Sequence, residues 1–446
     1  MRPASGGMPA DTTAPWRPTL AHFRVVFASI VMVVAAVLWR RPDLLVLAAP
    51  LAIVSAWSAV TRPAQPPLFT SHVTDSTVRE GEATTWNGTF DSADAIDSVV
   101  AVMPPGQWLV TRPKSGVVTS SVRPPGTSSV ASPTTTLTIA VRAVRWGHRT
   151  VERITVTANS SWGAFRWSYR TQPAQLISLP LPATFDSKAS IRRSNGLVGL
   201  DRSARPGDGS EFAGIRPFQS GDRMRRINWP RSLRSGSLHV TSTWADQDTH
   251  VVLEVDATDD LGVSEGVDGA ASSIDIAVRA AGAIAEHYVN RGDRVTLRVL
   301  GSARSRDLPS ATGRAHLRRV LDTLAAIQPG TDPRGLVGRG RSTTPAEALV
   351  IMLSPLVSTT ALERAVALAR RGVMVLVVDT LPGGVIESED EITAIAWRIR
   401  LLERSREIRI VQEVGVPVVR WQGPGSLDLF LRDVARRASA PRMADR

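Results

Sequence analysis

The sequence predicts a membrane helical hairpin, then an all-β sandwich, then an α/β doubly wound domain, along a chain of 446 residues. Two apolar runs lie near the N-terminus, at residues 25–39 and 44–60. Apolar and polar residues alternate from about residue 66 to residue 182, and strands alternate with helices after residue 249. A chain of this length is too long for one ordinary domain, which agrees with several separate parts.

Composition places the chain among globular proteins and narrows its chemistry. Hydrophobic residues make up 43% of the sequence and charged residues 21%, which is enough apolar sequence to build cores. The net charge is +12, but Lys114 and Lys188 are the only lysines, and this preference for arginine is typical of GC-rich, actinobacteria-like genomes. We therefore expect no nucleic-acid partner. The absence of cysteine excludes disulfides, thiol catalysis and thiolate metal ligands.

Residues 20–62 are expected to form two transmembrane helices that anchor the protein in the cell membrane, after an N-terminal tail over residues 1–19. Each apolar run is slightly shorter than the roughly 20 residues that span a bilayer. Arg24 can snorkel, however, and Trp39 and Trp57 lie near run ends, where interfacial tryptophans are common. A secretory signal peptide is the alternative. The immediate second run and the lack of a small-residue cleavage site favour the hairpin.

Charges beside the apolar runs predict the orientation of the hairpin. Four arginines lie on its open side and two in its connection: Arg2, Arg17, Arg24 and Arg62 against Arg40 and Arg41. Because positively charged flanks stay in the cytoplasm, we expect both helix ends and the soluble domains to be cytoplasmic.

Residues 66–190 are predicted to form the β-sandwich. The segments "TLTIAVRAV" and "VERITVTANSSWGAFRWSYR" alternate between apolar and polar residues, and turns rich in proline and glycine separate such segments. No run with helical periodicity interrupts this region, so a small sandwich is the simplest interpretation.

Residues 249–438 are predicted to form the α/β domain, followed by a tail over residues 439–446. Strands are expected at "HVVLEVD", "DRVTLRVL", "ALVIMLS", "VMVLVVD" and "VPVVRW", and helices over residues 271–290, 315–327, 359–371, 391–407 and 427–437. The alternation predicts a parallel sheet that binds ligands at the carboxyl ends of its strands. The first strand ends in "DATDD", from Asp256 to Asp260.

Between these domains, residues 191–248 form an arginine-rich segment. Ten arginines and four carboxylates fall between residues 191 and 240. The most specific pattern consists of Arg216, Phe218, Gly221, Asp222, Arg225, Ile227, Trp229, Ser232, Arg234, Gly236 and Leu238. It resembles the pattern of a bacterial membrane-anchored family called domain of unknown function 58, whose last domain is similar to von Willebrand factor type A domains. The resemblance implies a von Willebrand factor A-like fold for residues 249–438 and a cytoplasmic MoxR-type AAA+ ATPase as partner.

The segment can be interpreted as a structural clasp. Ser-Gly-Asp suits a tight turn in which Gly221 supplies a positive φ and Asp222 accepts backbone hydrogen bonds. Ile227 and Trp229 have the same parity in an extended segment, which predicts that both are buried on one side.

The same segment can also be interpreted as a docking surface for an acidic partner. In that case Arg223, Arg225 and Arg231 would be exposed while Trp229 stays buried. The two interpretations are compatible, and both remain open at the level of sequence.

The family resemblance also raises the question of a metal ion. Von Willebrand factor A-like domains typically bind Mg²⁺ through Asp-x-Ser-x-Ser after the first strand and through residues of later loops. Here Asp256 is present, Thr258 supplies a hydroxyl and Asp260 replaces the second serine, while Pro355 stands where related domains often carry an aspartate. We therefore expect no cofactor, with Mg²⁺ at this degenerate site as the alternative.

The leading functional hypothesis is a non-enzymatic, membrane-anchored scaffold or adaptor. It would serve a MoxR-type AAA+ ATPase in the maturation of a client protein or complex, and no catalytic residue is assigned. The sequence contains no Gly-x-x-x-x-Gly-Lys phosphate loop, so the ATPase would be a separate chain. The alternatives are a metal-assisted hydrolase that uses the Asp256 cluster, and an outward-facing envelope-assembly or adhesion module.

Overall fold

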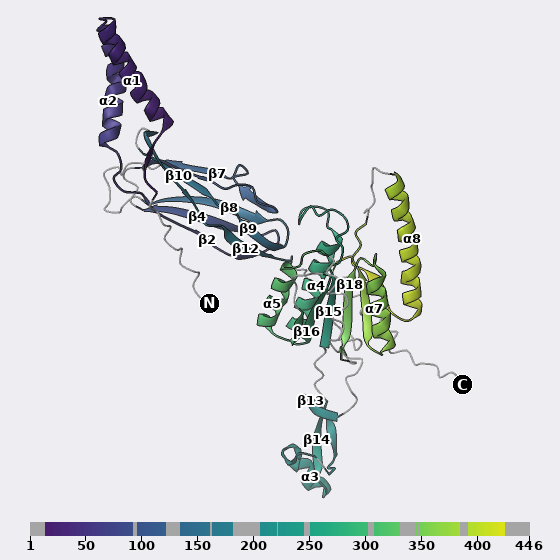
Figure 1. Ribbon diagram of the computed structural model, residues 1–446. Coiled ribbons are helices and arrows are strands. Elements are labelled where there is room, and N and C mark those ends of the chain that lie inside the picture. Colours follow the sequence, from purple (N-terminus) through teal and green to yellow (C-terminus); the bar gives the residue numbers. More distant parts are fainter. Residues whose placement is uncertain are drawn as a thin grey trace. The chain divides into compact units, whose positions relative to one another are not determined.

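The chain divides into two compact units (Figure 1). The first contains Met1–Leu179 and Gly266–Asp268, and the second contains Pro180–Glu265 and Gly269–Arg446. The computed structural model describes residues 14–91, 96–121, 134–160, 163–181, 206–220, 222–244, 250–301, 307–330, 344–345, 348–383 and 391–423.

Two apolar helices form a hairpin in the first unit. Helix α1 spans Leu20–Leu38 and helix α2 spans Asp43–Val60, and both are long and apolar enough to cross a membrane. The 19 residues of α1 extend about 28 Å, close to the roughly 30 Å of a hydrocarbon core. Large apolar side chains such as Phe27 and Val37 point outward, as a lipid-facing surface requires. The two predicted helices are confirmed, and they suggest a membrane anchor.

The rest of the first unit is a β domain of three sheets. Its strands are β1 (Arg17–Pro18), β2 (Leu68–Val73), β3 (Thr77–Arg79), β4 (Ala83–Asp91), β5 (Ile96–Val102), β6 (Leu109–Arg112), β7 (Val117–Ser121), β8 (Thr135–Ala143), β9 (Gly147–Val151), β10 (Thr155–Ser160), β11 (Phe165–Arg170) and β12 (Ala174–Leu179). The sheet orders are β1-β11-β10-β5-β7, β2-β4-β8-β6 and β3-β12-β9.

One hydrophobic core joins the two larger sheets of this domain. Every second residue of β4 is buried, because successive side chains of a strand point to opposite faces. Trp86 and Phe90 of β4 share a core cluster with Trp167 of β11. The rings of Phe90 and Trp167 lie 6.0 Å apart in an edge-to-face arrangement, which is favourable for aromatic pairs. Two sheets around one core is the arrangement that the alternating sequence predicted.

The residues just before α1 also belong to the β domain. Trp16 is buried in the core, and its indole N–H donates to the carbonyl of Gln65 at 2.9 Å. Strand β1 pairs with β11, and the N–H of Thr19 donates to the carbonyl of Ala164 at 2.9 Å. The sequence predicted a separate tail over residues 1–19, but residues 14–19 are integrated here. Local periodicity could not reveal this, because the partner strand begins only at residue 165.

The second unit contains a six-stranded sheet with helices. The elements are β15 (His250–Asp256), α4 (Ser273–Asn290), β16 (Arg294–Leu300), β17 (Leu308–Ala311), α5 (Arg314–Ala325), β18 (Leu349–Ser354), α7 (Thr359–Arg370), β19 (Met374–Asp379), α8 (Glu391–Glu413) and β20 (Val418–Arg420). The strand order is β17-β16-β15-β18-β19-β20, and only the edge strand β17 is antiparallel to its neighbour. After β15 the chain adds β16 and β17 on one side of this strand, and then β18, β19 and β20 on its other side. The strand order therefore reverses between β15 and β18, and open α/β sheets bind ligands at the carboxyl ends of the strands at such a point.

Helices cover both faces of this sheet. Val252 of β15 and Val350 of β18 belong to the core cluster with residues of α7 and α8, while α4 packs with α5. Helix α4 starts with a capping box, in which the Ser272 and Asp275 side chains each accept from the other's backbone N–H. The predicted strands and helices up to residue 420 are present. Strand β17 was not predicted, α8 is longer than expected, and the predicted helix over residues 427–437 lies outside the described residues.

The arginine-rich segment forms a two-stranded sheet whose connection contains short helices. Its elements are β13 (Pro206–Pro217), the 3₁₀ helix η2 (Met224–Arg226), α3 (Trp229–Ser235) and β14 (His239–Trp244), and β13 pairs antiparallel with β14. The prediction that Ile227 and Trp229 lie in one extended segment is wrong, because Trp229 is the first residue of α3. Asn228 caps this helix, and Pro230 suits a first turn, where a missing N–H costs nothing.

Candidate functional site

Asp222 holds together the turn that follows β13. Arg216 donates two hydrogen bonds to its carboxylate, from Nη1 to Oδ2 at 2.7 Å and from Nη2 to Oδ1 at 2.6 Å. The backbone N–H of Gln219 donates to Oδ2 at 2.9 Å. The bond from Arg216, followed by that from Gln219, lowers the pKa of Asp222 and keeps it ionised. Arg216 and Asp222 thus have structural roles, while Gly221 lies outside the described residues.

Hydrogen bonds also fasten α3 to β14. The Asn228 side chain accepts from the backbone N–H of Arg231 at 3.1 Å, which caps the helix. The buried Ser232 hydroxyl donates to the carbonyl of Asn228 at 2.8 Å and accepts from the backbone N–H of His239 at 2.9 Å. Gly236 ends the helix at a φ of 68°, the left-handed conformation that favours glycine. Asn228 was missed in the sequence, although Asn before Trp-Pro is a helix-start signal.

Three further residues of the pattern contribute to the same framework. The backbone N–H of Phe218 donates to the carbonyl of Leu238 at 2.8 Å. Ile227 is half-buried and forms an isolated bridge with Val240, which is only 2% exposed. Together with the Asp222 turn and the α3 cap, these contacts give η2 and α3 a defined place on the hairpin.

The apolar side chains of η2 and α3 face solvent in the described structure. Trp229 is 59% exposed, Met224 is 79% exposed and Leu233 is 81% exposed. Trp229 and Leu233 are four residues apart on α3, so they share one helix face. The expected burial of Trp229 is therefore wrong, and the buried residue of α3 is Ser232. Exposed tryptophan and leucine on one short helix are typical of an interaction surface.

Arginines surround these apolar side chains. Arg223, Arg225 and Arg231 are exposed, as the docking interpretation requires, and Arg234 is exposed as well. We call the set Met224, Arg225, Trp229, Arg231, Leu233 and Arg234 the α3 surface. It combines positive charge with large apolar groups, a composition suited to a partner that offers carboxylates around an apolar recess.

The second candidate site lies where β15 ends, at the carboxyl edge of the sheet. Asp256 Oδ1 accepts from the backbone N–H of Thr258 at 3.1 Å and from its hydroxyl at 2.7 Å, and Oδ2 accepts from the Ser354 hydroxyl at 2.6 Å. Asp260 is used differently, because its Oδ1 accepts from the backbone N–H of Ile274 at 3.2 Å, in the first turn of α4. Of the three predicted residues, the structure thus brings Asp256 and Thr258 together, and Ser354 is a further member of the site that the sequence analysis missed. Its position at the end of the predicted strand "ALVIMLS" could have identified Ser354.

Comparison with known proteins identifies the family. Residues 214–399 match the profile described as "Protein of unknown function DUF58". "Uncharacterized protein Rv1480" of Mycobacterium tuberculosis and "Uncharacterized protein Mb1516" of Mycobacterium bovis are each 30% identical to this chain over 251 residues, 54% of this chain and 71% of each relative. The chain belongs to the DUF58 family. The DUF58 match includes the α3 surface and the Asp256 site, whereas the helical hairpin and the β domain precede it.

The described residues at the Asp256 site of this DUF58 protein offer few oxygen ligands for a magnesium ion. Both Asp256 oxygens accept hydrogen bonds from protein groups, and Pro355 offers no carboxylate. The nearby strand-end carboxylate, Asp379, binds Arg404 at 2.5 Å, and Arg404 also donates to the Pro355 carbonyl at 2.9 Å. Among the described residues, no three His, Cys, Asp or Glu side chains form a metal-binding group. Octahedral Mg²⁺ needs several oxygens directed towards one point.

A buried ionic network on β15 was missed by the sequence interpretation. Glu254 is completely buried and accepts from Arg298 at 3.1 Å and from Arg364 at 2.6 and 2.7 Å. Arg298 also donates to the Thr344 hydroxyl at 2.8 Å. The hydrogen bond to Glu254 raises the pKa of Arg364. The only sequence signal is one glutamate inside "HVVLEVD", and nothing local identifies the two arginines that neutralise it.

Proposed function

We propose that this DUF58 protein is a non-enzymatic, membrane-anchored interaction protein that binds its partner through the α3 surface. The observation that carries the proposal is the exposure of Trp229 and Leu233 among arginines. Both residues lie on α3, in the connection between β13 and β14, where hydrogen bonds hold the rest of the segment in place. Leaving a tryptophan and a leucine in water forgoes the stabilisation of burial. A partner that covers them would gain it.

The chemistry of the α3 surface defines the partner. Tryptophan and arginine are the side chains most often found at the energetic centre of protein interfaces. Arg225, Arg231 and Arg234 would attract carboxylates and speed the encounter, while Trp229 and Leu233 would enter an apolar recess. The matching surface is therefore acidic at its rim and apolar at its centre.

The partner we propose is a cytoplasmic MoxR-type AAA+ ATPase, with this chain as its membrane adaptor for a client protein or complex. The strand order β16-β15-β18-β19, with β17 antiparallel at the edge, supports a von Willebrand factor A-like description of the second unit. The sequence lacks a phosphate loop of its own, which supports a separate ATPase. Four arginines flank the open side of the α1–α2 hairpin and two lie in its connection, which supports a cytoplasmic position for the β domain and the second unit.

No observation favours the hydrolase alternative. Asp256 accepts hydrogen bonds from Thr258 and Ser354, which is a structural role at the end of β15. The outward-facing alternative is tested by topology. A reporter fused after residue 446 should be active in the cytoplasm, and activity only outside the cell would contradict the ATPase partner.

A binding measurement tests the proposal directly. The detergent-solubilised full chain is titrated with a purified MoxR-type ATPase, and the Kd is measured at low and high salt. We expect the double variant Trp229→Ala/Leu233→Ser to weaken binding about tenfold or more, as loss of an interface anchor does. The triple variant Arg225→Ser/Arg231→Ser/Arg234→Ser should also weaken binding and lose most of its salt dependence, because salt screens exposed charges.

Matched controls remove side chains of the same kind elsewhere on the second unit. Val263 is 76% exposed, and Arg370 and Arg371 are exposed, so Val263→Ser and Arg370→Ser/Arg371→Ser should bind like wild type. Trp229→Ala alone should change the free energy of unfolding by less than about 0.5 kcal/mol, because most of this side chain is in water. Equal loss of binding in the controls, or full binding by both α3 variants, would refute the proposal.

A further inference from the structure

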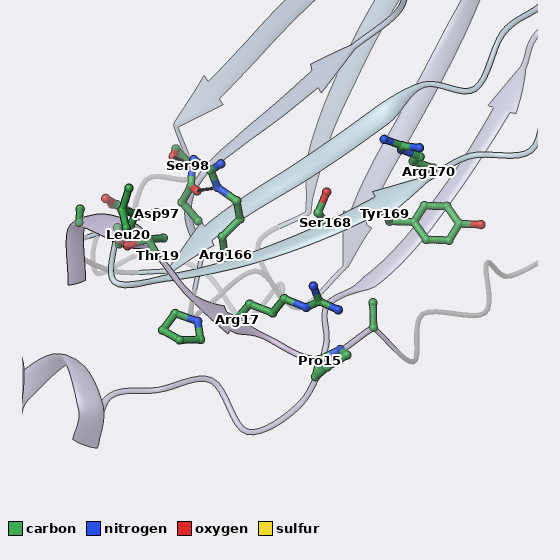
Figure 2. A pocket seen from close by; sticks show the side chains of 15 residues that line it. Pro15, Arg17, Thr19, Leu20, Asp97, Ser98, Arg166, Ser168, Tyr169 and Arg170 are labelled. Atoms are coloured by element: carbon green, nitrogen blue, oxygen red, sulfur yellow. Dashed lines mark hydrogen bonds between the residues drawn. The ribbon is translucent and has the colours of Figure 1, made fainter. Parts of the chain in front are cut away.

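A pocket of about 810 Å³ lies in the β domain beside the start of α1 (Figure 2). Residues before and within the first turn of α1 form one wall, and strands β5, β10 and β11 form the other. Arg17, Arg166 and Arg170 line it, together with polar groups that include Thr19 and Ser168. The pocket precedes the part of the chain that matches the DUF58 profile, so the family assignment gives it no role.

The floor of this pocket is a single row of residues across four neighbouring strands. Arg17 of β1 pairs with Arg166 of β11, Arg166 pairs with Asn159 of β10, and Asn159 pairs with Ser98 of β5. Paired residues of antiparallel strands point to the same face. Side-chain hydrogen bonds connect the row, because Asn159 donates to Ser98 at 3.1 Å and accepts from Arg166 Nε at 3.3 Å. Arg166 is therefore held in place through its Nε and belongs to the lining of the pocket.

Two arginines directly opposite each other are an unfavourable pair. Like charges at such positions destabilise a sheet. None of Arg17, Arg166 and Arg170 forms an ion pair with a carboxylate of any described residue. Among the described residues of the lining, Asp97 is the one acidic residue, which leaves a formal excess of two positive charges in that set. An anion bound in this pocket would offset the excess positive charge.

The pocket lies at the depth of the lipid headgroups if α1 spans the bilayer. Leu20 and Ala21 line it, and Arg24 marks the start of the uninterrupted apolar run, about 6 Å along the helix axis from Leu20. The headgroup layer on each side of the hydrocarbon is about 5–7 Å thick. Arg62, just after the last residue of α2, lies over the ring of Phe165 at 5.3 Å, and Thr19, just before the first residue of α1, donates to the carbonyl of Ala164. The start of α1 and the end of α2 are therefore both close to the start of β11. The first turn of α1 contains no acidic residue that would oppose an anion.

We propose that this pocket binds the phosphate headgroup of an anionic membrane phospholipid. Arginine guanidinium groups bind phosphate oxygens through paired hydrogen bonds, and Arg17, Arg166 and Arg170 are the residues of the lining that can supply them. Ser168 and Thr19 lie in the lining and offer hydroxyl groups to a glycerol headgroup. The lipid would fix the β domain against the membrane at the foot of α1. This proposal rests on the membrane anchor and is independent of the α3 surface and its partner.

The test uses the full chain in a non-ionic detergent, titrated with phosphatidylglycerol, with phosphatidylcholine of the same acyl chains, or with inorganic phosphate. Bound lipid is counted by native mass spectrometry, and the Tm is measured in parallel. Phosphatidylglycerol should bind about tenfold or more tightly than phosphatidylcholine and raise the Tm. The variant Arg17→Gln/Arg166→Gln should lose this preference. Arg153→Gln, which removes an exposed arginine of the same domain outside the pocket, should keep it.

Measurements without lipid keep the test valid if a variant is unstable. Because the two arginines repel each other, Arg17→Gln alone should melt at or above the wild-type Tm in lipid-free detergent. A lower Tm would show that Arg17 is held by protein contacts, which would overturn the argument. Equal binding of the two lipids, an unchanged preference in the double variant, or equal protection by inorganic phosphate at the same concentration would also overturn it. The last result would indicate a site for free anions.

Discussion

The substitution Glu254→Gln removes one charge and hardly changes the volume of the side chain, yet it should strongly destabilise the sheet of the second unit. This side chain is completely buried and accepts three hydrogen bonds from two arginines, at 3.1, 2.6 and 2.7 Å. In Glu254→Gln the volume is kept, but Arg298 and Arg364 lose their counter-charge. Arg298 is only 6% exposed and cannot recover its hydration, whereas Arg364, at 26%, recovers part of it.

These exposures determine the expected magnitude. Removing one partner of a buried ion pair costs about 3–5 kcal/mol, because the remaining charge is left uncompensated. The partial exposure of Arg364 and the bond from Arg298 to Thr344 place the expected cost near the lower limit, about 3 kcal/mol. Arg364→Gln should cost less than Glu254→Gln, since Arg298 would still neutralise Glu254. The double variant Glu254→Gln/Arg364→Gln should be less destabilised than the sum of the single variants.

Hydrogen exchange measures this effect where it occurs. A loss of about 3 kcal/mol corresponds to roughly a hundredfold faster exchange of the β15 amides under conditions where opening is at equilibrium. Glu363→Gln is the matched control, because Glu363 is the exposed neighbour of Arg364 on α7. It should change stability by less than about 0.5 kcal/mol. Wild-type protection of β15 in Glu254→Gln, or equal loss of protection in Glu363→Gln, would refute the reasoning.

Two further predictions concern pH and metal. Burial, followed by the charges of Arg298 and Arg294, lowers the pKa of His250 below 6.5 in the folded protein. The unfolded chain therefore binds the proton more tightly than the folded protein does. The stability that depends on neutral His250 is complete above pH 6.5 and is lost as the pH falls through the lowered pKa. His250→Gln should therefore flatten the loss of Tm between about pH 7 and pH 5, and an unchanged slope would contradict this. At the Asp256 site, Mg²⁺ should leave the Tm of the full chain unchanged in both wild type and Asp256→Asn. A Mg²⁺-dependent rise that disappears in Asp256→Asn would show that the ion binds there.

Elements with a strong local period were predictable from the sequence. The apolar runs gave both helices of the hairpin, and "HVVLEVD" corresponds to β15 from its first residue to its last. Helix α4 begins two residues after its predicted start and ends where predicted. The edge strand β17 was missed because Leu308–Ala311 is short and contains a proline, and its pairing with β16 alone makes it a strand.

The candidate sites were predictable in composition but not in geometry. The sequence identified the arginine-rich pattern and Asp222 as an acceptor of backbone hydrogen bonds, but not the pairing of Asp222 with Arg216. It placed Trp229 inside the protein because two-residue parity was applied to a stretch that is helical. The cap at Asn228 shows that Trp229 starts a helix, and the placement of this helix on β14 then decides whether Trp229 is exposed.

The sequence by itself determined which segments are apolar helices, which alternate as strands, and where arginine gathers, because these properties depend on neighbours within a few residues. Only the tertiary structure decided which polar groups meet. Ser354 reaches Asp256 across 98 residues, and Arg364 reaches Glu254 across 110. Arg17 faces Arg166 because β1 pairs with β11 in one particular register. Such meetings depend on strand order and register, which the packing of the whole core selects, so local pattern carries no record of them.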